Sequence, residues 1–309
     1  MITGILYALA ATALSGNSAV LSKVAVRRAD LYYVCAISNT VILLIFLAAT
    51  LLEGKEATLP DLQNLLLLAG SGFALAFSWL FYYLAVREGQ VAVILAVQNL
   101  AVVLTLGLCR IVLGESVSWM KGVGSVCIIV AAGIMAVSSL REGAGNDTVD
   151  VELKVTVSNT VEDARIPVLH SYRWLWYDML SMMFLSLSLV LTRLTQSQAS
   201  NNMIGMWQYL IVAAAMWVLA FRMRSPKVIA DFTLPAWGWT VLCGITLGLS
   251  YAALYRSFEY APVNSATAIF RMSIVFSALI AEVLLREPVT RGDRLGLPVM
   301  VAGILLYTL

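Results

Sequence analysis

The chain has 309 residues, of which 61% are hydrophobic and 12% are charged, and its mean hydropathy is +0.87. A soluble domain carries roughly 25% charged residues, so this composition excludes a soluble protein and indicates a membrane protein with many spans. The formal net charge is only +2, which gives no indication of a nucleic-acid partner.

Ten apolar stretches follow one another along the chain, and each is long enough for one membrane crossing. A helix of about 20 residues spans the hydrocarbon layer of a bilayer, which is roughly 30 Å thick. The stretches cover residues 2–26, 31–52, 62–86, 89–113, 117–140, 174–196, 203–221, 235–258, 261–285 and 293–309. No basic segment precedes the first stretch, so we interpret it as a span and not as a secretory leader. The sequence therefore predicts an all-α membrane protein of ten transmembrane helices.

One long polar stretch, residues 141–173, separates the first five spans from the last five. Within it, apolar residues alternate with mostly polar ones from Val149 to Val157. This pattern is typical of a half-buried strand, although a lone hairpin is only marginally stable. We predict a first repeat over residues 1–140, a polar connecting loop over 141–173 and a second repeat over 174–309.

The two halves of the sequence resemble each other at a nearly constant offset. A shift of 172 residues superposes Tyr83 on Tyr255, Val91 on Val263, Ala96 on Ala268, Glu115 on Glu287 and Gly124 on Gly296. Because each half holds five spans, the second copy enters the bilayer upside down relative to the first. The result is an inverted-topology repeat, an architecture that places a site at the membrane midplane between the two halves.

Glycines at small-xxx-small spacing occur twice in the second half, and such spacing predicts close helix packing. They are Gly244 with Gly248, and Gly292 with Gly296.

An arginine, Arg271, lies near the middle of the ninth span, too deep for its side chain to reach either surface. Asn264, Thr267 and Glu282 flank it at helical spacing, so one face of this span is polar. Ionisable residues inside a bilayer usually mark a functional site. The alternative is an arginine that backbone carbonyls hold for structural reasons.

No acidic residue accompanies Arg271 at that depth. Of the 18 acidic residues, only Asp178 and Glu282, with Asp293 at the first position of the tenth span, lie inside spans, and each lies near a span end. A buried cation needs carbonyls, water or an anionic ligand to offset its desolvation, so a bound carboxylate or phosphate is the predicted partner. Without an acidic residue at mid-depth, the sequence favours exchange or facilitated diffusion over proton antiport.

The repeat offset brings Asn99, preceded by Gln98, into register with Arg271, so two equivalent spans carry polar groups near their centres. Aromatic residues line the span before each of them, and matched amides occur in the second and seventh spans. For the aromatic residues, ordinary packing or an interfacial belt is the alternative. The predicted substrate-binding residues are Arg271, Asn99, Gln98, Asn39, Gln208, Trp79, Tyr83, Tyr251, Tyr255, Asn264 and Thr267.

The four cysteines lie in apolar runs without metal-type spacing. We interpret them as small packing residues. The sequence indicates no cofactor, no metal and no catalytic residue.

Two segments resemble the EamA-type unit of the drug/metabolite transporter (DMT) superfamily. The first copy carries Tyr82-Tyr83-Leu84-Ala85-Val86-Arg87-Glu88-Gly89, then Leu113-Gly114-Glu115 and Gly124. The second copy carries Leu254-Tyr255, Ala261-Pro262, Leu285-Arg286-Glu287, Gly296 and Ala302-Gly303. This resemblance covers essentially the whole chain, and it implies a basket of ten helices around a central cavity that moves small metabolites. Two positions depart from it: Asn39 stands where many members carry an arginine, and Arg286 replaces the glycine before Glu287.

The resulting expectation is a secondary transporter that exports or exchanges small polar or amphipathic metabolites such as amino acids by alternating access. The alternative substrates are nucleotide-type or sugar-derived anionic metabolites. A channel would show a charged ring or filter sequence, and an intramembrane enzyme would need a nucleophile with a base, or metal ligands, inside the bundle. The only histidine, His170, lies in the polar stretch.

The expected location is the cell membrane, which is the inner membrane in a bacterium. The expected partners are the lipid bilayer and a small-molecule substrate with an anionic group. We expect no nucleic-acid partner, and we expect a monomer or a weak homodimer.

Basic residues gather in the loops that follow odd-numbered spans. They are Arg27, Arg28, Arg87, Arg141, Lys154, Arg165, Arg173, Arg222, Arg224, Lys227, Arg286, Arg291 and Arg294. The positive-inside rule predicts that these loops, including residues 141–173, are cytoplasmic and that both termini lie outside.

Overall fold

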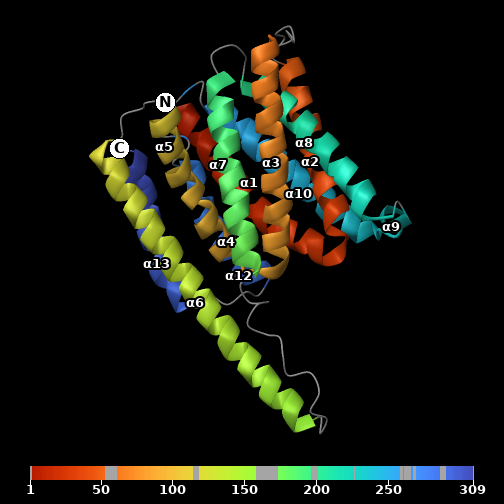
Figure 1. The fold of residues 1–309 in the computed structure, drawn as a ribbon, viewed down its shortest axis with the longest axis vertical. Helices are drawn as coiled ribbons and strands as arrows, with labels where there is room; N and C mark the ends of the chain where they lie inside the picture. Colours follow the sequence, from red (N-terminus) through yellow and green to blue (C-terminus); the bar gives the residue numbers. More distant parts are fainter. Residues whose placement is uncertain are drawn as a thin grey trace.

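The structure, a computed structural model of the chain, describes residues 2–52, 61–113, 118–157, 173–195, 201–225, 227–257, 260, 266, 269–285 and 290–308. Within these ranges the regular elements are helices, which pack into one bundle (Figure 1). The first half contains α1 (Ile2–Arg28), α2 (Leu31–Leu52), α3 (Leu62–Glu88), α4 (Val91–Gln98), α5 (Leu100–Leu113) and α6 (Trp119–Val157). The second half contains α7 (Arg173–Thr195), α8 (Asn201–Met223), α9 (Lys227–Ala230), α10 (Leu234–Ser257), α12 (Ser273–Leu284) and α13 (Arg291–Thr308).

Eight helical segments in the described part of the chain are long and apolar enough to cross a bilayer. They are α1, α2, α3, α4 with α5, the first part of α6, α7, α8 and α10. The chain is therefore a multi-pass membrane protein. α12 packs against α1 and α13 packs against α6 within the same bundle, and the count of ten spans stays a prediction.

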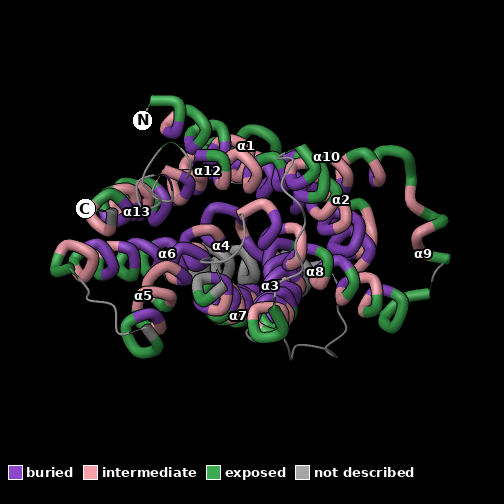
Figure 2. The backbone as a smooth tube through the Cα atoms, turned by 90° about the horizontal axis from the view of Figure 1, so that it is seen from above, coloured by how far each residue is buried: buried purple, intermediate pink, exposed green. Residues whose placement is uncertain are grey.

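Buried residues line the inside of the bundle and exposed ones its outside. Seen from above, α12, α1, α10 and α2 form one row, and α5, α7, α3 and α8 form a second row opposite (Figure 2). Large apolar side chains cover the outer surface, where Leu52, Val283 and Ile111 are 88%, 82% and 81% exposed. An outer surface of this kind suits contact with lipid tails, because no water is present there to favour polar groups.

The contacts between helices repeat when the two halves are exchanged. α3 packs along α7 as α10 packs along α1, and α3 contacts α8 as α10 contacts α2. In the same way, α5 contacts α7 as α12 contacts α1. Two further pairs join helices that are equivalent to each other in the two repeats, namely α2 with α8 and α6 with α13. A pseudo-two-fold axis between two repeats produces this pattern. The predicted fold class is confirmed, while the boundaries at residues 140 and 173 stay predictions.

Two equivalent spans are discontinuous. α4 and α5 meet at a turn, where Val102 N donates to the Asn99 carbonyl at 3.1 Å. At the start of α12, Val275 N donates to the carbonyl of Met272, the residue that precedes this helix, at 3.0 Å. Both bonds join residues three apart, as in a 3₁₀ turn, so each interrupts the α-helical ladder. Broken helices at matching positions of two repeats are typical of transporter sites.

Glycines set how closely α10 approaches α2 and how closely α13 approaches α6. A Cβ atom on Gly244 would lie 2.8 Å from the Ser38 carbonyl oxygen of α2. A Cβ atom on Gly296 would collide with Met135 of α6. The close packing predicted from the glycine spacing is therefore confirmed at both interfaces.

The predicted strand between Val149 and Val157 is wrong, because α6 continues as a helix to Val157. This end of α6 extends beyond the rest of the bundle (Figure 1). A helix that already exists gains one hydrogen bond for each residue added, whereas a lone hairpin is marginally stable and needs further strands or packing. The alternating pattern therefore did not decide the local structure.

Candidate substrate-binding site

A cavity lies in the centre of the bundle, and residues at the breaks of both discontinuous spans line it. About 100 Å³ of the cavity is open to water-sized groups, which is room for several water molecules or one small polar metabolite. Its polar lining residues are Ser15, Ser18, Ser22, Ser78, Gln98, Asn99, Ser181, Arg271 and Ser273. They come from both halves of the chain, as expected for a site between two inverted repeats.

Six of the predicted substrate-binding residues line this cavity. They are Arg271, Asn99, Gln98, Trp79, Tyr83 and Tyr251. Arg271 lies directly before the break that precedes α12, and Asn99 lies at the break between α4 and α5. Arg271 and Asn99, which the repeat offset brings into register in the sequence, therefore line the same cavity in the structure.

Two predicted amides do not line the cavity. Asn39 is fully buried on α2, where its Nδ2 donates to the Cys35 carbonyl at 2.8 Å. Gln208 is buried on α8, where its Nε2 donates to the hydroxyls of Ser71 and Thr192. Both side chains are used in contacts within or between helices.

The remaining predicted residues also lie elsewhere or are not described. Tyr255 packs on Phe46, with ring centroids 5.5 Å apart. Asn264 and Thr267 lie outside the described residues, so their part in the site stays a prediction.

Three N–H donors of cavity-lining residues have no hydrogen-bond partner within the described part of the chain. They belong to Arg271 Nε, Asn99 Nδ2 and Trp79 Nε1, and each atom is buried. The Tyr209 hydroxyl lies near Trp79 Nε1 but outside hydrogen-bond geometry. Buried polar groups are nearly always satisfied, so three free donors on residues of one cavity are unusual.

A hydrogen-bonded group forms another part of the wall. Gln98 Nε2 donates to Asp178 Oδ1 at 2.6 Å and to Ser181 Oγ at 2.8 Å. Ser181 Oγ in turn donates to the Ser78 carbonyl at 2.9 Å. This group joins α4, α7 and α3 on one side of the cavity.

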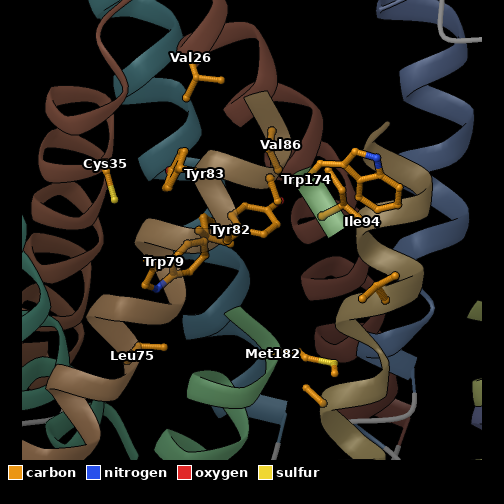
Figure 3. Packing of buried hydrophobic residues seen from close by; sticks show 14 of the residues in the cluster. Val26, Cys35, Leu75, Trp79, Tyr82, Tyr83, Val86, Ile94, Trp174 and Met182 are labelled. Atoms are coloured by element: carbon orange, nitrogen blue, oxygen red, sulfur yellow. The ribbon is translucent and has the colours of Figure 1, made fainter. Parts of the chain in front are cut away.

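Aromatic side chains complete the lining. On α3, the rings of Trp79 and Tyr82 meet edge to face with centroids 5.5 Å apart (Figure 3). Tyr251 of α10 packs on Phe270 with ring centroids 5.8 Å apart. Such rings give an apolar wall with polar edges, which suits an amphipathic ligand.

The serines and Asp178 were missed as site residues. Ser15, Ser18 and Ser22 of α1 recur at spacings of 3 and 4, which places them on one helical face, and this was a usable signal. Asp178 gave no such signal, because its burial depends on α3 and α4. Within the described ranges, no group of three His, Cys, Asp or Glu side chains is placed to hold a metal ion.

The sequence of the chain matches the profile of the EamA-like transporter family over residues 2–137 and 172–309. A protein of a Sinorhizobium species, named as an uncharacterized transporter in the cobO 3' region, is 30% identical over 134 residues. The aligned part is 42% of this chain and 94% of that protein. The two family matches cover one half of the helical bundle each, in agreement with the repeated contacts. The chain therefore belongs to the EamA-like transporter family of the drug/metabolite transporter superfamily, and it is a multi-pass transporter of the cell membrane.

Proposed function

We propose that this transporter exports or exchanges small polar metabolites that carry a carboxylate, with amino acids as the substrate class, by alternating access around the central cavity. The observation that carries the proposal is the set of unsatisfied N–H donors on Arg271, Asn99 and Trp79. A carboxylate has about four lone-pair sites and accepts hydrogen bonds only, so it is the complement of such donors.

The charge of Arg271 supports an anionic group at the same place. Removing a cation from water costs several kcal/mol, and a carboxylate that it contacts offsets this cost. Among the described residues, Arg271 makes no ion pair with an acidic side chain. Its planar guanidinium donates two parallel hydrogen bonds to a carboxylate, which a lysine does not do.

Size and charge favour amino acids over nucleotide-type or sugar-derived anions. The open space of about 100 Å³ is below the roughly 300–1,000 Å³ of pockets that hold drug-sized ligands, which favours a small metabolite over a nucleotide. Arg271 is also the only basic residue in the lining that the structure describes. A single cation suits one carboxylate better than a diphosphate.

The repeated helix contacts support alternating access. The most extensive inter-repeat contacts, such as α3 with α7 and α10 with α1, have equivalents on the two sides of the pseudo-two-fold axis. If the two repeats exchange conformations, a state that is open to one side of the membrane becomes a symmetry-related state that is open to the other side.

The test is counterflow in proteoliposomes that contain the full chain and an unlabelled mixture of the twenty L-amino acids. Wild-type protein should take up labelled amino acids from outside in exchange for the unlabelled amino acids inside the vesicles. Arg271→Lys should lower the uptake rate at least about tenfold, because a loss of about 1.4 kcal/mol of binding is tenfold in affinity.

Arg110→Lys is the matched control, because Arg110 is exposed in the last turn of α5, away from the cavity, and should leave uptake unchanged. Uptake at the wild-type rate by folded Arg271→Lys and Arg271→Ala proteins would overturn the role of Arg271. No uptake of any amino acid by the wild type would overturn the substrate class.

A further inference from the structure

Asp178 is a buried carboxylate directly behind the cavity wall. It is 0% exposed on α7, and its Oδ1 accepts a hydrogen bond from Gln98 Nε2 at 2.6 Å. Its other oxygen, Oδ2, is buried and has no hydrogen-bond partner among the described residues. A buried acidic group with one unsatisfied oxygen lowers the stability of the fold, and ionisable groups inside a membrane protein usually have a functional role.

The ionisable group that faces Asp178 from the helices packed against α7 is Tyr82 of α3. α4 has no ionisable side chain, and Cys109 and Arg110 of α5 lie at the distal end of that helix. Within the described helices, Asp178 therefore has no cationic partner.

The basic residues at this end of the bundle make other contacts. Arg173, at the start of α7, donates to the Tyr177 hydroxyl at 3.0 Å. Arg87 pairs with Glu88 at 3.4 Å. Lys23 of α1 donates to the carbonyl of the residue that caps α3. None of these contacts neutralises the Asp178 carboxylate behind the cavity wall.

The contact with Asp178 decides which end of the Gln98 amide faces the cavity. An ionised carboxylate can only accept a hydrogen bond, so the amide nitrogen must point at Asp178. Gln98 lines the cavity, and its Nε2 is already held by Asp178 and Ser181. The carbonyl oxygen Oε1 is then the amide atom left to accept a hydrogen bond from a ligand.

A proton on Asp178 permits the reverse arrangement. A protonated carboxyl group gains an O–H that can donate to the amide carbonyl, and when it does so the amide turns over and its NH₂ group faces the cavity. Ser181 can follow the change, because a hydroxyl both donates and accepts. The cavity wall thus changes from an acceptor to a donor when one proton binds.

We propose that Asp178 is a proton-binding residue of the transport cycle and that its protonation switches Gln98 from hydrogen-bond acceptor to donor toward the substrate. The proton comes from water in the cavity, adds to a carboxylate oxygen and leaves to water on the other side. An ammonium group of a substrate binds only to the acceptor form, so substrate and proton compete. This competition gives exchange of a proton for an amino acid, and it rests on the function proposed above.

This inference differs from the expectation, drawn from the sequence, that no buried carboxylate drives coupling. That expectation placed Asp178 at a span end. In the structure its side chain is fully buried and bonded to a residue of the cavity wall.

The first test uses the proton itself as the probe. Infrared difference spectra between acid and alkaline pH are recorded on the full-length protein in lipid. We expect a carbonyl band of a protonated carboxyl group that is absent from Asp178→Asn and present in the control Glu282→Gln, which replaces an exposed carboxylate of α12. A side-chain amide band should change with the same midpoint and vanish in Gln98→Met.

An unchanged carboxyl band in Asp178→Asn would overturn the proposal, as would an amide band that does not follow the carboxyl band. If Asp178→Asn does not fold, Gln98→Met alone decides, because it keeps Asp178 and should shift the midpoint of the carboxyl band. A midpoint equal to that of the wild type would then refute the coupling of the two groups.

The second test measures labelled amino acids in proteoliposomes with an imposed pH gradient and the membrane potential clamped at zero. For one-to-one exchange, wild-type protein should accumulate substrate about tenfold for each unit of pH difference. Asp178→Asn, which cannot bind and release this proton, should lose this accumulation. Wild-type counterflow that ignores the gradient would overturn this inference alone, whereas absence of counterflow in the wild type would overturn the proposed function.

Discussion

Replacing Gly244 by alanine should destabilise the bundle although alanine is the better helix former. The added Cβ would lie 2.8 Å from both the Ser38 carbonyl oxygen and Val41 Cβ, closer than real Cβ atoms come. The carbonyl belongs to the backbone of α2, so only a shift of α2 away from α10 makes room. Overpacking of this kind costs about 1–3 kcal/mol, whereas the alanine gains about 0.5–1 kcal/mol of helix propensity. The difference is a net loss of unfolding free energy of up to about 2.5 kcal/mol, with a central value of about 1.3 kcal/mol.

Gly238→Ala is the matched control on the same helix, because nothing lies within 4 Å of its added Cβ. Only the propensity change applies there, so this variant should equal or exceed the wild type in stability. The assay is reversible unfolding of the purified protein from mixed micelles by increasing denaturing detergent. Equal stability of the two variants would refute the reasoning, because it would mean that α10 and α2 are not held at this distance.

Two further predictions concern the cavity and the orientation of the chain. Trp79→Phe keeps an aromatic ring but removes the Nε1 donor, so KM for a transported amino acid in counterflow should rise about 3- to 10-fold. An unchanged KM would remove Trp79 from the set of ligand donors. Ser158→Cys, in a chain whose four native cysteines are replaced, should react with a membrane-impermeant reagent only after cells are permeabilised, because the polar connecting loop is predicted to be cytoplasmic; labelling of intact cells would reverse the orientation.

The polar centres of the site could be predicted because they depend on chain properties alone. Arg271 is conspicuous by its depth in an apolar span, and the repeat offset points from it to Asn99. The first fact follows from the length of the apolar span, and the second follows from the spacing between the two repeats. The cavity then places the two residues together because inverted repeats bring equivalent spans to one centre.

Side-chain direction could not be predicted in the same way. Gln208 and Asn39 occupy matched positions in the two repeats, yet neither lines the cavity: Gln208 bonds to a serine of α3, and Asn39 bonds to a carbonyl of its own helix. The rotation of a helix about its axis is set by its packing, which no single span encodes. Asp178 is the converse case, since it lies near the start of α7 but Gln98 and the surrounding helices bury it completely.

The central claim is that the cavity binds the carboxylate of an amino acid through Arg271, and ligand-dependent thermal stability of the purified protein tests it most directly. Each L-amino acid is compared with its own carboxamide, which keeps the side chain and the amine but removes the negative charge. Binding to the folded state raises stability, by about 2.7 kcal/mol at a ligand concentration of 100 times Kd. The account predicts that at least one amino acid raises Tm, that its carboxamide does not, and that Arg271→Ala abolishes the rise. Equal stabilisation by acid and carboxamide, or a rise that persists in Arg271→Ala, would contradict it.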